Sequence, residues 1–235
     1  MTRLKLLPPS CRQQSGFSLV ELAVVMVVLG LILGGMLMPL STQRDINNRK
    51  NTEAQLTEIY QALLGFAAIN GRLPCPATAT SAGLADPNVA NTNCQQEHGF
   101  VPGRTLGLDG SYNGNNLLTD PWNNPIRYSL SSVNGWAYAN QIDISLAGGN
   151  YRVCRQSGCG AGTIIAENIV VVLHSRGKDG ALGTASPNQL ENTDNDADFV
   201  KTEISEANNA EFDDIPRWIS PNILALELLR AGKLE

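Results

Sequence analysis

An apolar run of 24 residues, positions 17–40, constrains this chain more than any other feature. At about 1.5 Å per residue, a helix of this length crosses the roughly 30 Å hydrocarbon core of a bilayer. The fifth residue of the run, Glu21, is its one charge. A carboxylate at the centre of a membrane costs on the order of 2–3 kcal/mol, so a charge inside a span indicates a function. A secretory signal would be shorter and would end in a small-residue cleavage site.

The residues at the start of the run form a motif. Gly16, Phe17, Ser18 and Glu21 follow a short basic leader and open the apolar helix. This arrangement resembles the precursors of type IV pilins and pseudopilins. The resemblance implies removal of a leader of residues 1–16 by a prepilin peptidase, methylation of the new N-terminal Phe17, and a role for Glu21 in docking subunits into a filament. Cleavage would place the new amine about one helical turn from Glu21.

The same resemblance implies where the chain resides and what it binds. We expect a single-pass inner-membrane protein with a periplasmic C-terminal domain, which joins a filament after assembly. Its partners would be the membrane, other pilin or pseudopilin subunits, the peptidase and the inner-membrane assembly platform. A plain membrane anchor is the alternative. An anchor would account for the length of the apolar run but not for the charge of Glu21 within it.

The charge balance argues against nucleic acid as a partner. The chain carries a net charge of −5, and removal of the three leader cations leaves −8. Phosphate binding requires clustered Lys and Arg. No Gly-x-Ser-x-Gly, phosphate loop or pair of metal-ligand histidines is present in the sequence, and His98 and His174 lie in separate regions. These motifs carry the common hydrolytic and phosphoryl chemistries, so we expect no enzyme activity.

Four of the five cysteines lie beyond the leader, on the side of the membrane where disulfides persist. The four allow three pairings. We favour Cys75 with Cys94 and Cys154 with Cys159, because each bond closes a short local loop. The alternative is a zinc site, for which the spacing of Cys154 and Cys159 is tolerable but that of the other pair is not.

The pattern predicts an α+β fold, in which a long N-terminal helix packs on a small antiparallel sheet, as in pilins. Residues 41–70 continue the helix with apolar side chains at helical spacing: Leu56, Ile59, Tyr60, Leu63 and Ala67. Asn70, Gly71 and Pro74 end it. Gly34, Gly35 and Pro39 weaken the helix between its membrane and amphipathic halves and predict a hinge.

We expect residues 71–235 to form one globular domain. Residues 76–98 have no apolar period and are predicted to form a surface loop. Short β-branched or aromatic runs predict strands at residues 126–130, 136–139, 142–146, 151–154 and 169–173. The apolar stretch at residues 221–234 is predicted to be a helix that covers the sheet.

Two oxygen-rich loops predict a calcium site, because Ca²⁺ takes 6–8 oxygen ligands. One loop reads Ser175-x-Gly177-x-Asp179-Gly180, and the other alternates carboxylates over residues 194–198. Together with residues 70–74 and 120–125, these loops resemble the major pseudopilins of type II secretion. The resemblance implies bound calcium and the following ligands: Ser175, Asp179, Asp194, Asp196 and Asp198. The alternative is a solvated acidic surface.

These features predict a structural subunit of a type II secretion pseudopilus or of a type IV pilus-like filament. Two alternatives remain open. The first is a minor pilin whose domain binds a ligand in adhesion or DNA uptake, for which a basic or aromatic patch would be expected. The second is an anchored binding protein that never polymerises, for which Glu21 would be dispensable.

Overall fold

The computed structural model describes residue 16 and residues 18–87, 93–133, 148–180, 186–207 and 209–233; for residues 34–41 it describes the backbone alone. The chain divides into two compact units, residues 1–44 and residues 45–235, and each is described by itself.

The helix α1 spans Leu19–Asn70 and so runs from the first unit into the second. It ends where the sequence predicts, because Gly71 adopts a φ of +65° that favours glycine and donates its N–H to Ala67 O at 2.7 Å. Among the described residues, no helix contains a stretch long and apolar enough for a membrane span. The predicted span includes Phe17 and the side chains of residues 34–40, which lie outside the description. The hinge at Gly34, Gly35 and Pro39 therefore stays a prediction.

The part of α1 that belongs to the second unit buries the apolar face that its sequence predicts. Leu56, Ile59, Leu63 and Ala67 are all fully buried. Tyr60, at the edge of this stripe, is half-buried and packs against the same cluster. These side chains form the main hydrophobic core with the four-stranded sheet and the last helix.

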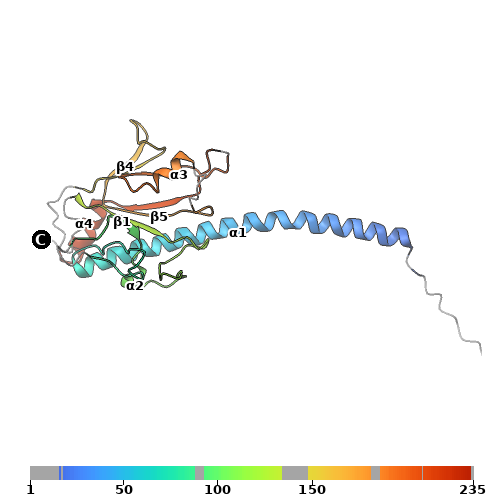
Figure 1. The fold of residues 1–235 in the computed structure, drawn as a ribbon, viewed down its shortest axis with the longest axis horizontal. Helices are drawn as coiled ribbons and strands as arrows, with labels where there is room; N and C mark the ends of the chain where they lie inside the picture. The colour runs from blue at the N-terminus through green and yellow to red at the C-terminus, as the bar shows by residue number, and fades with distance from the viewer. Residues whose placement is uncertain are drawn as a thin grey trace, which may run out of the picture. The chain divides into compact units, whose positions relative to one another are not determined.

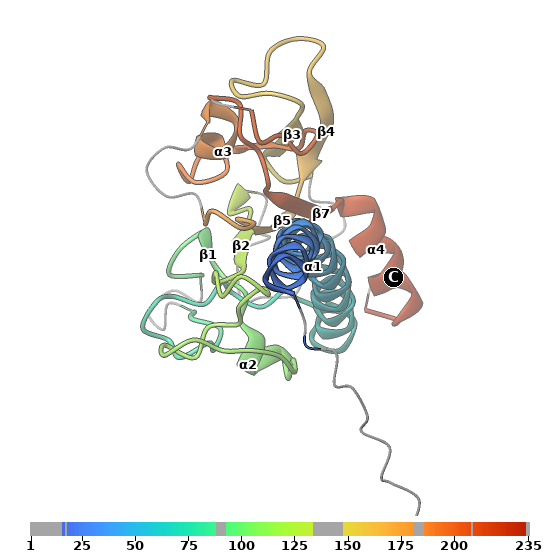
Figure 2. The same ribbon diagram turned by 90° about the vertical axis from the view of Figure 1, so that its right-hand side faces the viewer.

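The four-stranded sheet is antiparallel throughout, with strand order β1-β2-β5-β7. Its strands are β1 (His98–Phe100), β2 (Arg127–Leu130), β5 (Val171–Ser175) and β7 (Ile215–Ile219). Figure 2 looks along α1 and shows β5 and β7 beside the teal part of that helix, with α4 (Pro221–Arg230) on another side. Leu224 and Leu228 of α4 enter the core, so this helix closes it as predicted. The short helix α2 (Gly103–Leu106) follows β1 in the chain.

A second sheet of three strands has the order β4-β3-β6. It contains β3 (Tyr151–Cys154), β4 (Ile164–Ile169) and β6 (Asp198–Val200), and α3 (Pro187–Glu191) contacts β6. Figure 1 shows β4 and α3 on the same side of β5. The β3–β4 pair is antiparallel, whereas β3 and β6 run parallel. Tyr151, Val153 and Phe199 form a second, smaller core with Val172 of the first sheet.

The α+β class is confirmed, but the prediction of one antiparallel sheet is wrong. A second sheet exists and it contains a parallel pair. Strands β1, β4, β6 and β7 were not predicted, and the strand predicted at residues 169–173 lies at 171–175. A bend at Val170 separates the two strands, so that Ile169 ends β4 and Val171 begins β5. The strands predicted at 136–139 and 142–146 fall outside the described residues.

Candidate functional site

The N-terminal motif includes the first turn of α1. Ser18 precedes the helix, and its backbone N–H donates to Glu21 Oε2 at 3.1 Å. The Val20 N–H donates in turn to Ser18 Oγ at 3.3 Å. This pattern is related to a capping box, but Ser18 accepts from Val20 instead of Glu21; the two side chains still satisfy backbone donors that the helix leaves unpaired. Glu21 therefore has a local structural role that the sequence analysis missed, although Ser-x-x-Glu ahead of an apolar run is its known signature.

The cleavage and methylation residues lie at the edge of the description. Gly16 is exposed and is not part of α1, whereas Phe17 falls outside the described residues. The predicted roles of both residues remain predictions. Glu21 Oε2 is hydrogen-bonded to the amide of Ser18, the residue that follows Phe17 in the chain.

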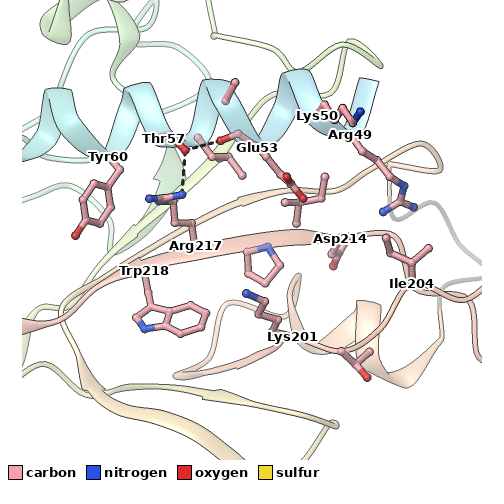
Figure 3. Close-up of a pocket in the computed structure, with 15 residues that line it drawn as sticks. Arg49, Lys50, Glu53, Thr57, Tyr60, Lys201, Ile204, Asp214, Arg217 and Trp218 are labelled. Carbon is pink, nitrogen blue, oxygen red and sulfur yellow. Dashed lines mark hydrogen bonds between the residues drawn. The ribbon is translucent and has the colours of Figure 1, made fainter. Parts of the chain in front are cut away.

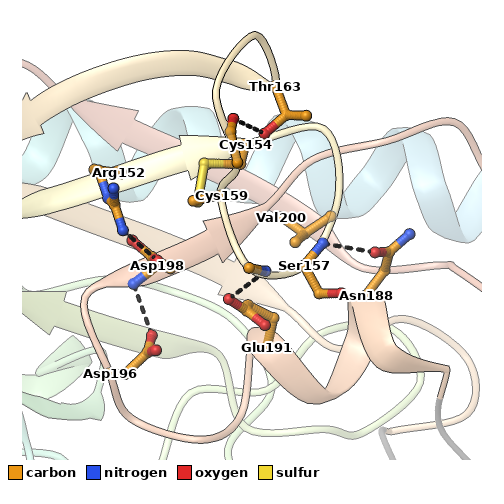
Figure 4. The surroundings of a disulfide bond; sticks show 12 residues. Arg152, Cys154, Ser157, Cys159, Thr163, Asn188, Glu191, Asp196, Asp198 and Val200 are labelled. Atoms are coloured by element: carbon orange, nitrogen blue, oxygen red, sulfur yellow. Dashed lines mark hydrogen bonds and ion pairs between the residues drawn. A yellow bond between two sulfur atoms is a disulfide. The ribbon is translucent and has the colours of Figure 1, made fainter.

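The four mature-chain cysteines form the two local disulfides that the sequence predicts. Cys75 is bonded to Cys94 with a Cα–Cα distance of 5.2 Å, and Cys154 to Cys159 with 5.4 Å. A zinc site would need these sulfur atoms as free thiolates, which the bonds exclude. The Cys154–Cys159 loop also contacts α3, because Ser157 N–H donates to Asn188 Oδ1 at 2.9 Å and Gly158 N–H donates to Glu191 Oε1 at 3.0 Å (Figure 4).

The first predicted calcium loop is anchored on the turn at residues 120–125. Ser175 Oγ donates to Asp120 Oδ2 at 2.5 Å, and Asn124 Nδ2 donates to Gly177 O at 2.7 Å. Ser175 and Asp120 are both buried, and burial raises the pKa of the Asp120 carboxyl. The Ser175 hydroxyl is thus directed to Asp120. Residues 120–125 and residues 175–180, which both resemble pseudopilin sequences, are therefore in contact. Hydrogen bonds join them directly.

Asp179 lies beside Asp213, a residue that the sequence analysis did not identify. The amide Nε2 of Gln189 donates to Asp179 Oδ2 and to Asp213 Oδ1, each at 2.9 Å. Asp213 Oδ2 also accepts the Asp179 N–H at 3.2 Å. Burial raises the pKa of Asp213, and the neighbouring charge of Asp179 raises it further.

The second predicted loop brings two of its carboxylates together with Glu191. Among the described residues, ligand atoms of Glu191, Asp196 and Asp198 lie within 4.8 Å of one another. Both Asp198 oxygens accept from the Arg152 guanidinium, at 2.7 and 2.6 Å (Figure 4). Asp194 instead accepts the Asp196 N–H at 3.2 Å. The pKa of Asp196 is raised by burial and then by the charges of the neighbouring carboxylates.

The five predicted calcium ligands are therefore divided in the fold. Asp196 and Asp198 share one carboxylate group with Glu191, and Asp194 is hydrogen-bonded at its edge. Ser175 and Asp179 are not part of that group among the described residues. Arg152 was not identified from the sequence, and Glu191, which begins the acidic stretch of residues 191–199, was not assigned as a ligand.

One comparison with known proteins gives a result. The family model of the prokaryotic N-terminal methylation motif matches residues 11–37. The chain carries the precursor signature of type IV pilins and pseudopilins. Neither the curated proteins nor the solved structures that were compared with the chain include a match.

The pilin-type signature carries three consequences at the level of the family. It indicates a precursor that is processed by a prepilin peptidase, assembly with other pilin subunits, and association with the cell envelope. The match ends at residue 37, so it does not extend into the unit of residues 45–235.

Proposed function

We propose that this chain is a structural subunit of a type II secretion pseudopilus or a related type IV pilus-like filament. The observation that carries the proposal is the methylation motif at residues 11–37, which leads into the helix α1. In this proposal the leader of residues 1–16 is removed, and the N-terminal half of α1 holds the subunit in the inner membrane and then in the filament core. The periplasmic domain of residues 71–235 forms the outer surface, and the assembly platform and other subunits are the partners.

Glu21 has two tasks in the proposal. In the isolated subunit its carboxylate accepts the Ser18 N–H and caps α1. In the filament it also satisfies the charged amine of a neighbouring Phe17 and so fixes the axial register. An ion pair offsets much of the cost of a lone carboxylate in an apolar surrounding, because it neutralises the charge, which a cap alone does not.

Two substitutions separate these tasks. Glu21→Ala removes both the cap and the charge, whereas Glu21→Gln keeps an acceptor suited to a capping box but removes the charge. We expect processing at Gly16–Phe17 with both variants, shown by N-terminal sequencing, and loss of filaments with both. Normal filaments with Glu21→Gln would reduce Glu21 to a cap. A parent chain that keeps its leader would refute the proposal itself.

The same assay separates the alternatives. An anchored binding protein that does not polymerise predicts that neither variant changes its behaviour. A minor pilin predicts that the variants are lost from filaments that another subunit builds. If the chain is a main subunit along the whole filament, the total mass of filaments should fall when either variant removes the charge of Glu21.

We also propose that Ca²⁺ binds to the group formed by Glu191, Asp196 and Asp198. The closeness of the three carboxylates and the raised pKa of Asp196 support it, because a divalent cation relieves repulsion among them. The bond of Asp198 to Arg152 already neutralises part of this charge. The ion would add charge neutralisation and cross-link the acidic loop to α3.

The calcium proposal predicts a higher melting temperature of residues 45–235 in millimolar Ca²⁺ than in EDTA. Glu191→Gln should remove the difference. Asp179→Asn, a carboxylate of the other loop, is the matched control and should retain it. A melting curve of the parent chain that is the same in both buffers would refute the proposal.

A further inference from the structure

A groove in the second unit has a charge opposite to that of the chain as a whole. It encloses about 690 Å³ between residues 49–60 of α1, residues 201–204 and the outer edge of β7. Its lining includes the following cations: Arg49, Lys50, Lys201 and Arg217. Two carboxylates, Glu53 and Asp214, oppose them. We call this cavity the α1–β7 groove.

The cations of the groove are available to a ligand. In the part of the chain that the structure describes, none of them has a carboxylate within 4.0 Å. Lys201 lies over the Trp218 ring at 5.2 Å, and Arg217 lies over the Tyr60 ring at 4.7 Å. Arg217 is further fixed by donation from Nη1 to Thr57 Oγ1 at 3.0 Å (Figure 3). Aromatic rings and a hydroxyl thus hold these two cations in place without neutralising them.

The two ends of the groove differ in their side chains. Figure 3 shows Arg49 and Lys50 at one end of the groove and Tyr60 and Trp218 at the other. Asp214 lines it from the β7 side; this residue is 4% exposed, and its Oδ1 has no hydrogen-bond partner among the described residues. The groove follows about three turns of α1, or roughly 16 Å.

Recognition in this groove depends on side chains. Five consecutive residues, 214–218, line it, so it faces the open edge of β7. An edge strand can accept a further strand through backbone hydrogen bonds, but Pro216, the second residue of β7, has no N–H to donate. The basic side chains of the groove therefore favour an acidic segment as its ligand.

We infer that the α1–β7 groove binds the acidic stretch of residues 191–198 from a second copy of this chain. Glu191, Asp194 and Asp196 of that stretch are partly or fully exposed, and none of residues 191–198 lines the groove of its own subunit. A basic groove and an acidic loop at two different places on one subunit form a head-to-tail contact, which extends into a filament where the rotation between subunits does not close a ring. The inference rests on the proposed filament function. It adds which domain surfaces meet.

A photo-cross-link tests the contact in the full-length chain. Ile204 lines the groove and is 58% exposed, so it can be replaced by p-benzoylphenylalanine. Membranes of cells that also contain a prepilin peptidase are irradiated in EDTA, which leaves the carboxylates free of metal. We expect a covalent dimer, joined to the tryptic peptide of residues 179–201. A dimer joined elsewhere, or no dimer from a processed chain, would overturn the inference.

Charge exchange gives a second, independent readout. Lys201→Glu should lower the yield of dimer about tenfold, because like charges then face each other. Lys233→Glu, an exposed cation outside the groove, is the matched control and should leave the yield unchanged. Addition of Asp194→Lys to Lys201→Glu should restore the dimer. If the yield is insensitive to Lys201→Glu, or is not restored, the contact does not depend on these charges and the inference fails. Loss of N-terminal processing would be a failure of the proposed function, and sequencing of the same membranes detects it.

Discussion

Asp214 gives the second unit a specific dependence on pH. Its carboxyl is almost fully buried, and Oδ2 accepts from Asn192 Nδ2 at 2.7 Å. Burial raises its pKa from 3.8 to about 7; the Asn192 bond opposes this effect, and the charge of Asp213 adds to it. Between pH 4 and 7 the native chain therefore keeps a proton that the unfolded chain releases.

The sign and size of the effect follow from this proton. Because the native state binds more protons in this window, the free energy of unfolding falls as the pH rises from about 4 to about 7 and does not fall further through Asp214 above that. A pKa difference of about three, at about 1.4 kcal/mol for each unit, corresponds to a loss on the order of 4 kcal/mol. Asp214→Asn cannot ionise, and its side-chain oxygen can still accept from Asn192. The variant should therefore match the parent near pH 4 and exceed it by up to this amount at pH 7.

Urea unfolding of residues 45–235 at several pH values measures the difference directly. The quantity of interest is the stability of the variant minus that of the parent, because other carboxyls titrate equally in both. Asp109→Asn, at an exposed position, is the control and should give a difference that does not change with pH. A difference for Asp214→Asn that is constant from pH 4 to 7, or a variant less stable than the parent at pH 7, would refute the argument.

Two further predictions concern the core and the disulfides. Leu63→Ala removes a fully buried side chain from the contact between α1 and the four-stranded sheet, and should lower the free energy of unfolding by about 2–5 kcal/mol in urea titrations. Replacement of Cys75 and Cys94 together by serine opens a loop that spans 19 positions and should cost about 3 kcal/mol. The double variant and the parent should have equal melting temperatures once both are reduced, and retention of the oxidised parent's stability by the oxidised variant would contradict the prediction.

The parts of the fold that the sequence predicts are those in which local signals agree. The buried face of α1 from Leu56 to Ala67 has a helical period, and the helix ends at a glycine with positive φ. Strand β3 has apolar side chains on both sides of one charged residue, Arg152, and helix α4 buries Leu224 and Leu228 at helical spacing. In these segments local propensity and tertiary packing favour the same structure.

The missed strands are those in which the local signal opposes the tertiary contact. Pro216 argues against a strand, yet β7 forms because it lies at the sheet edge and pairs with β5 along its other side. Asp198 belongs to a pattern typical of a metal loop, yet it begins β6 and pairs with Arg152 of β3. The partner that decides each case is distant in the chain, so no local pattern contains it.

The division of the predicted calcium ligands has the same origin. The prediction joined two loops through one ion because both contain carboxylates. Between them lies α3, whose Gln189 is fully buried. Its Nε2 donates to Asp179 and to Asp213, and its Oε1 accepts the Ser186 N–H at 3.3 Å. A neutral amide thus supplies hydrogen bonds to the first loop, whereas the Arg152 guanidinium supplies them to Asp198 of the second. Each loop has its own donor, and among the described residues only Glu191, Asp196 and Asp198 place three carboxylates close enough together to hold one divalent ion.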